Sequence, residues 1–198
     1  ALAGGIRVVT TYGMSETCGG CVYDGVPLDG VEVTLDPADG RVVLGGPVVA
    51  GGYLGAPEAT AEAFVSDGDV RRFRTGDLGA LAPDGTLTVL GRVDDVVNTG
   101  GEKVAPAAVE RALLAVDGVR AACVVGLPDD EWGQIVAALV VSSGAAPDDH
   151  ALCAAVRAAC GRAAVPRLLL RADTVPERGI GKPDRTAVAE ILAGARRT

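Results

Sequence analysis

Four short segments of the chain place hydroxyl, carboxylate or cationic side chains beside glycine. In chain order they are TYGMSET at 11–17, RTGD at 74–77, GRVDD at 91–95 and GIGKPDR at 179–185. Hydroxyl and carboxylate groups near a glycine turn can bind phosphate and Mg²⁺, and a lysine can bridge a carboxylate and a phosphate oxygen. One such segment could arise by chance, but four in this order are hard to explain as coincidence.

Each segment also has an ordinary structural interpretation. TYGMSET can be a turn that ends a strand and caps a helix, and on this segment alone the two interpretations weigh about evenly. Asp77 can be a turn aspartate before a strand, and GRVDD can be a charged turn after a hairpin. Lys182 between glycines can be a surface turn. The functional interpretation therefore rests on the set and not on any one member.

Together the four segments resemble those of the adenylate-forming enzymes, which activate a carboxylic acid with ATP. The resemblance implies that Tyr12 lies against the adenine ring and that Gly13 belongs to the same nucleotide-binding motif. It implies that Ser15 donates its hydroxyl to phosphate, that Thr17 lies near the phosphate, and that Glu16 ligates magnesium. The family usually has threonine where this chain has Ser15, but the hydroxyl is retained.

The other three segments take their expected roles from the same resemblance. Asp77 would accept hydrogen bonds from the ribose hydroxyls, a task that suits two carboxylate oxygens. Arg92 would contact the nucleotide. Lys182 would be the catalytic cation placed against the reacting carboxylate and phosphate. Asp94 matches a hinge, whose backbone rotation moves a small domain between two half-reactions.

A glycine pair downstream resembles the loop that lines the entry path of the thiol. Gly100 and Gly101 would let the backbone approach a narrow pantetheine arm closely. We interpret Glu102 and Glu110 near this loop as structural. The cofactors and substrates implied are ATP and its product AMP, Mg²⁺, CoA and a small aromatic carboxylic acid.

Within the family, the stretch from Gly19 to Val31 resembles the branch of o-succinylbenzoate–CoA ligases, which serve menaquinone biosynthesis. Two alternatives stay open. The chain could belong to an aryl- or acyl-activating domain that loads a carrier protein, or it could be an inactive fragment that serves as a binding partner. The family's hydroxyl-rich phosphate loop and most of its acyl pocket are expected upstream of Ala1, so an upstream N-terminal portion is an expected partner.

Composition limits the other functions. The chain has 198 residues with a net charge of −8, which argues against nucleic-acid binding and binding to an anionic membrane. It contains no apolar run long enough to span a membrane. Five cysteines cannot all pair, which favours a reduced, cytoplasmic setting. A homodimer stays open.

The elements that must position these residues fall into two groups. We expect an α/β and α+β fold: residues 1–91 as the β-rich, C-terminal part of a large AMP-binding domain, and 92–198 as a small, mobile α+β domain. The first group begins with a strand over Ile6–Thr11 that ends at the Tyr12–Gly13 turn, followed by two hairpins. The second reads hairpin, α, β, β, α, β, α, with Asp184 capping the last helix.

Overall fold

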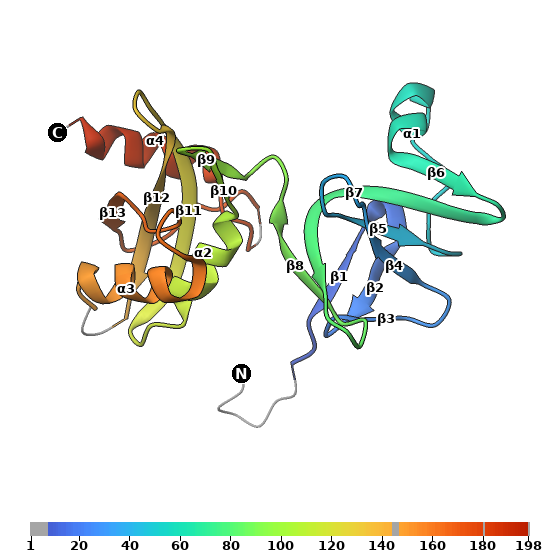
Figure 1. The fold of residues 1–198 in the computed structure, drawn as a ribbon, viewed down its shortest axis with the longest axis horizontal. Helices are drawn as coiled ribbons and strands as arrows, with labels where there is room; N and C mark the ends of the chain where they lie inside the picture. The colour runs from blue at the N-terminus through green and yellow to red at the C-terminus, as the bar shows by residue number, and fades with distance from the viewer. Residues whose placement is uncertain (1–7, 144–146, 180, 198) are drawn as a thin grey trace. The chain divides into compact units, whose positions relative to one another are not determined.

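The fold is given by a computed structural model that describes residues 8–143, 147–179 and 181–197 (Figure 1). The chain divides into two compact units, Ala1–Val93 and Asp94–Thr198. This division lies within the GRVDD segment. In the described parts of the chain, no helix combines the length and the apolar composition needed to cross a membrane.

Unit 1 is built from two antiparallel sheets. The first joins β1 (Thr11–Met14), β2 (Gly19–Tyr23) and β3 (Val26–Pro27), with a 3-10 turn, Ser15–Thr17, between β1 and β2. The second has the order β4-β5-β7-β6, with β8 paired to β7; its strands are β4 (Glu32–Leu35), β5 (Arg41–Gly45), β6 (Phe64–Asp67), β7 (Val70–Leu81) and β8 (Leu87–Arg92). Helix α1 (Pro57–Ala63) begins with proline, which is favoured in the first turn of a helix because the N–H that it lacks has no partner there.

The expected strand over Ile6–Thr11 is wrong where the structure describes it. Residues 8–10 are irregular, β1 begins at Thr11, and residues 6 and 7 lie outside the described residues. The reason is the partner strand, because β2 ends at Tyr23 opposite Thr11. Beyond that pair, the Thr10 N–H donates to the Asp24 carboxylate at 2.8 Å instead of to a strand. The β-branched run predicted a strand, but no described strand continues the ladder there.

Unit 2 is an α+β fold around one five-stranded sheet. The elements in chain order are β9 (Val97–Thr99), β10 (Glu102–Val104), α2 (Pro106–Leu114), β11 (Val119–Asp129), β12 (Gly133–Ser142), α3 (Asp149–Cys160), β13 (Leu168–Arg171) and α4 (Arg185–Arg196). The sheet order is β10-β9-β12-β11, and β13 runs parallel to β12. The order of elements expected from the sequence is therefore confirmed, as is the mixed α/β and α+β class.

The long strand β12 is buried on both faces. On one face, Val136, Ala138 and Val140 pack with the buried residues of α2 and α3. On the other face, the side chains that alternate with these pack against Val188 and Leu192 of α4; they are Ile135, Ala137, Leu139 and Val141. A strand covered on both sides has no polar face, which explains its nearly continuous apolar sequence. Helix α4 starts where expected, because the Asp184 carboxylate accepts from the N–H groups of Thr186 and Ala187, both at 3.1 Å. The helix then continues to Arg196.

Candidate functional site

The TYGMSET segment forms strand β1 (Thr11–Met14) and the 3-10 turn Ser15–Thr17, so Tyr12 and Gly13 lie in the strand and not in the turn expected from the sequence. The Thr17 hydroxyl is buried, accepts from the Met14 N–H at 3.0 Å and donates to the Gly19 carbonyl at 2.8 Å. A Cβ atom at Gly13 would collide with the same Gly19 carbonyl, so this position requires glycine. The Thr17 side chain thus holds the turn in shape. The Ser15 side chain is exposed and available to a ligand.

Glu16 lies in the same turn with its carboxylate oriented by a tyrosine. The Tyr53 hydroxyl donates to Glu16 Oε1 at 2.8 Å, and the Glu16 carbonyl accepts from the Ala50 N–H at 2.8 Å. Among the described residues no group of three or more His, Cys, Asp or Glu side chains could hold a metal ion. One carboxylate still fits Mg²⁺, which commonly takes one or two protein carboxylates and completes its shell with substrate phosphates and water.

Two of the predicted nucleotide-binding residues meet although 65 positions separate them. The Tyr12 hydroxyl donates to Asp77 Oδ2 at 2.8 Å. The buried Thr75 hydroxyl accepts from the Asp77 N–H at 3.0 Å and so fixes the backbone of Asp77. Burial, together with the neighbouring Asp77 carboxylate, raises the pKa of Tyr12 well above its usual range. Tyr12 is therefore a hydrogen-bond donor at every physiological pH.

Arg92 borders the same carboxylate. It is paired with Asp77 across the β7–β8 ladder, and its Nε atom lies 3.8 Å from Asp77 Oδ1. The Arg92 side chain is 55% exposed, whereas that of Asp77 is only 14% exposed. The structure thus brings Tyr12, Asp77 and Arg92 together, with one mostly buried carboxylate between an aromatic hydroxyl and an accessible cation.

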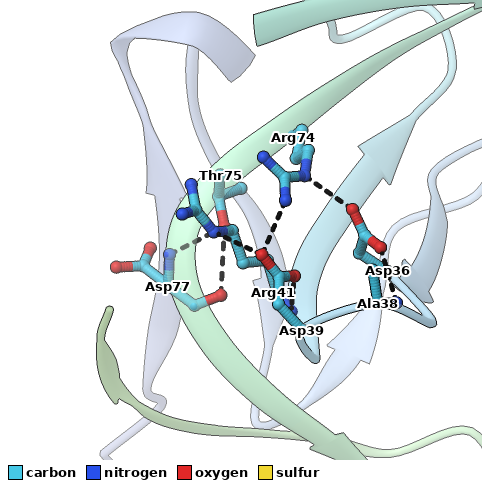
Figure 2. Close-up of polar contacts among 7 residues, drawn as sticks. All are labelled: Asp36, Ala38, Asp39, Arg41, Arg74, Thr75 and Asp77. Carbon is cyan, nitrogen blue, oxygen red and sulfur yellow. Dashed lines mark hydrogen bonds and ion pairs between the residues drawn. The ribbon is translucent and has the colours of Figure 1, made fainter. Parts of the chain in front are cut away.

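Two aspartates that sequence reasoning did not identify support this part of β7. Figure 2 shows Arg74, the residue before Thr75, reaching the turn that joins β4 and β5. Its Nε donates to Asp36 Oδ2 at 2.6 Å and its Nη2 to Asp39 Oδ2 at 2.6 Å, and Arg41 contacts Asp39 at 3.0 Å. The sequence showed only a hairpin turn here. Two aspartates flanking it were the available signal, but their partner lies 35 or more residues away.

Lys182 lies in a loop whose two sides are joined by backbone hydrogen bonds at its base. The Arg178 N–H donates to the Lys182 carbonyl at 2.7 Å, and the Asp184 N–H donates to the Pro176 carbonyl at 2.8 Å. Asp184 also caps α4, so the C-terminal side of the loop is anchored to a helix. The Lys182 side chain is exposed, and within the described part of unit 2 its ammonium has no ion-pair partner.

Gly100, the first residue of the glycine pair after β9, borders a cavity. Gly100 and Gly101 have φ angles of +58° and +84°. A cavity of about 390 Å³ adjoins Gly100, and its lining includes Trp132 and Arg167. The Arg167 guanidinium lies 4.0 Å from the centre of the Trp132 ring, a cation–π arrangement. Neither of these two residues was identified from the sequence.

The two glycines should respond differently to alanine. A Cβ atom at Gly100 would lie 2.6 Å from the Trp132 ring, whereas one at Gly101 would meet nothing within 4 Å. We expect Gly101→Ala to lower the free energy of unfolding of unit 2 by about 1 kcal/mol through backbone strain alone. Gly100→Ala adds overpacking and should cost about 1–3 kcal/mol more. Urea unfolding of the two variants tests this, and equal losses would contradict it.

The chain is similar to known proteins over nearly its whole length. Residues 108–182 match the family described as the AMP-binding enzyme C-terminal domain. The chain is 48% identical, over 98% of its length, to the Mycobacterium tuberculosis protein named "Probable 2-succinylbenzoate--CoA ligase", of which it covers 50%. It is 34% identical to the 2-succinylbenzoate–CoA ligase of Geobacillus kaustophilus, over 98% of this chain and 43% of that protein. The chain thus spans about half the length of the curated relatives it matches.

Solved structures show the same relationship. The amide bond synthetase McbA of Marinactinospora thermotolerans matches with a TM-score of 0.82 and 32% identity, over 93% of this chain and 42% of that one. The o-succinylbenzoate CoA synthetase MenE of Bacillus subtilis, in complex with the acyl-adenylate intermediate OSB-AMP, matches with a TM-score of 0.78 and 27% identity, over 93% of this chain and 41% of that one.

Proposed function

We propose that this chain, which belongs to the adenylate-forming enzymes, acts in an ATP-dependent ligase that joins a carboxylic acid to a thiol. The observation that carries the proposal is the contact of Tyr12 with Asp77, at 2.8 Å, beside Arg92. It assembles two motifs from distant parts of the chain into one arrangement of the kind a nucleoside needs. A set of unrelated turns would have no reason to converge in this way.

Asp77 is the proposed ribose-binding residue. A carboxylate can accept several hydrogen bonds, and the Tyr12 hydroxyl occupies one oxygen, which leaves acceptor capacity on the other. Arg92 next to it supplies an accessible positive charge for a nucleotide phosphate. The position of Tyr12 in this arrangement supports its aromatic ring as the surface beside the adenine base.

The hydroxyl and carboxylate of the adjoining turn are proposed to serve the phosphates. Ser15 is exposed and can donate to a phosphate oxygen, whereas Thr17 acts by holding the turn. Glu16, oriented by Tyr53, would hold Mg²⁺ together with phosphate oxygens of ATP. When bound, the ion would offset the negative charge that accumulates on the phosphates.

Lys182 is proposed to act in the first of two half-reactions. In that step a carboxylate oxygen attacks the α-phosphorus of ATP, a bond forms between them, and pyrophosphate leaves. Both reactants are anions, so a cation placed between them stabilises the transition state more than the separated reactants. In the second step the thiol attacks the acyl carbon and AMP leaves. Rotation at Asp94 is the proposed change between the steps, with Gly100 and Gly101 lining the path of the thiol.

The proposed acid is o-succinylbenzoate and the proposed thiol is CoA, which would place the enzyme in menaquinone biosynthesis. The support is that two relatives carry this activity in their names, one at 48% identity. The cavity beside Gly100, with its two arginines Arg162 and Arg167, is a suitable neighbour for a phosphate-bearing thiol.

The test is acid-dependent exchange of pyrophosphate into ATP by the natural full-length protein, with o-succinylbenzoate, benzoate and a fatty acid compared. Exchange strongest with o-succinylbenzoate is expected. AMP release with CoA is then compared with release in the presence of a pantetheinylated carrier protein, and a preference for the carrier would favour that acceptor. Absence of acid-dependent AMP formation with every aryl and succinylbenzoyl acid would refute ligase activity and support the inactive binding fragment.

A further inference from the structure

Arg185, the first residue of α4, binds carboxylates from two other segments of unit 2. Its Nη1 and Nη2 atoms contact the two oxygens of Glu110 on α2 at 2.7 and 3.2 Å, a bidentate pair. Its Nε lies 3.1 Å from Asp95 Oδ2. Nη1 also donates to the carbonyl of Val124 on β11 at 2.7 Å. One side chain thus joins α4, α2, β11 and the first residues of the unit.

The side chains that form these contacts are only partly exposed, so the surrounding protein restricts their conformations. The side chains of Arg185, Asp95 and Glu110 are 29%, 31% and 15% exposed. Glu110 is held from a second side, because its Oε1 also accepts from the Val124 N–H at 2.9 Å. Although burial opposes it, the two carboxylates raise the pKa of Arg185 above its usual value, so the guanidinium stays charged. The Glu110 pair fixes Arg185 to the core, and Asp95 is the additional contact.

The ion pair between Asp95 and Arg185 joins two segments that are expected to move together. Asp95 directly follows Asp94, the proposed hinge, and Arg185 lies three residues after Lys182. Between Lys182 and Arg185, the backbone is fixed by the Asp184 cap of α4 and by the bond from the Asp184 N–H to the Pro176 carbonyl at 2.8 Å. A short, rigid connection therefore runs from the residue after the hinge to the base of the Lys182 loop.

We propose that Asp95 is a positioning residue, which through Arg185 fixes the chain next to the hinge to the base of the Lys182 loop. Rotation at Asp94 then moves the lysine as part of a rigid body and not on a loose tether. Rigid placement matters because a misplacement of about 1 Å can cost about 100-fold in rate. This inference rests on the proposed function, since it assigns Asp95 a role only in the half-reaction that uses Lys182.

The test separates the two half-reactions in the natural full-length protein. Asp95→Ala leaves the Glu110–Arg185 pair in place and is expected to slow acyl-adenylate formation about tenfold. Thioester formation from supplied acyl-adenylate should stay within twofold. Asp95→Asn retains an acceptor oxygen and should recover part of the rate. Asp117→Ala, which removes an exposed aspartate of the same unit, is the matched control and should leave both rates unchanged.

Two further measurements distinguish positioning from a purely structural role. The Arg178 amide, which bonds to the Lys182 carbonyl, should exchange with deuterium faster in Asp95→Ala, while the melting temperature falls by less than about 5 °C. In a Lys182→Ala background, Asp95→Ala should cause no further loss of adenylation, because it acts through the lysine. Equal losses in both half-reactions, or full additivity with Lys182→Ala, would overturn the inference.

The Lys182→Ala variant, measured in parallel, distinguishes a failure of the proposed function from a failure of the inference about Asp95. Normal adenylation by Lys182→Ala would refute the proposed role of the lysine, and with it the role of Asp95. A slow Lys182→Ala together with normal rates in Asp95→Ala would refute only the inference about Asp95.

Discussion

Lys182→Ala is expected to slow acyl-adenylate formation by about 10²- to 10³-fold, which is the usual cost of removing one preorganised group that stabilises transition-state charge. The exposed ammonium has no ion-pair partner in the described part of unit 2, so the substitution leaves no buried charge unpaired. The rate of thioester formation from supplied acyl-adenylate should stay within about threefold of that of the unchanged protein, because the bond between the α-phosphorus and pyrophosphate is already broken in that intermediate. Rapid-quench measurement of each half-reaction provides the comparison.

Arg178→Ala is the control for this prediction. Arg178 is an exposed cation of the same loop, and its contact with Lys182 is made through its backbone N–H, which alanine retains. It should therefore keep both rates near those of the unchanged protein. Equal loss of both half-reactions in Lys182→Ala would refute a role confined to adenylation, and a comparable loss in Arg178→Ala would show that the loop's net charge matters and not the lysine itself.

Asp77→Ala is expected to weaken ATP binding about 100-fold. Hydrogen bonds to a charged group contribute about 1.5–3 kcal/mol each, and loss of two bonds to the ribose hydroxyls at the lower value corresponds to roughly this factor. The substitution also leaves the Tyr12 hydroxyl without its acceptor at 2.8 Å. Titration calorimetry with ATP measures the effect without knowledge of the acid substrate.

The control for Asp77 lies in the turn that joins β7 and β8. Asp84 is exposed, and its carboxylate accepts from the Thr86 N–H at 3.0 Å within that turn. Asp84→Ala should leave the Kd for ATP unchanged. Thermal melting of both variants separates binding from folding: a folded Asp77→Ala protein that binds ATP normally would exclude Asp77 from the nucleotide site.

The amide bond synthetase among the structural neighbours bears on the acceptor. Its match has a TM-score of 0.82, compared with 0.78 for the o-succinylbenzoate CoA synthetase MenE. Because the shared fold does not distinguish the final acceptor, fold similarity supports the adenylation step more strongly than it supports CoA. The choice between CoA and a carrier protein therefore depends on the acceptor assay.

Much of this protein follows from local sequence patterns. The order of elements in unit 2 was predictable because apolar periodicity and capping residues act over a few positions, as the Asp184 cap and the buried β12 illustrate. The four glycine-containing motifs were recognisable from their resemblance to those of a known family, because each motif is only four to seven residues long. Where a strand begins was less predictable: β1 starts at Thr11 because its partner β2 ends opposite it, and a β-branched run carries no information about its partner.

Only the tertiary structure decided which of these residues meet. Tyr12 contacts Asp77 across 65 positions, and Arg185 contacts Glu110 across 75. Trp132 stacks with Arg167 beside Gly100, and Arg74 reaches the two aspartates of a distant turn. Each contact depends on strand register or on the packing of a helix against the sheet. A single sequence supplies the chemical groups, but their convergence depends on long-range packing that no short window of residues specifies.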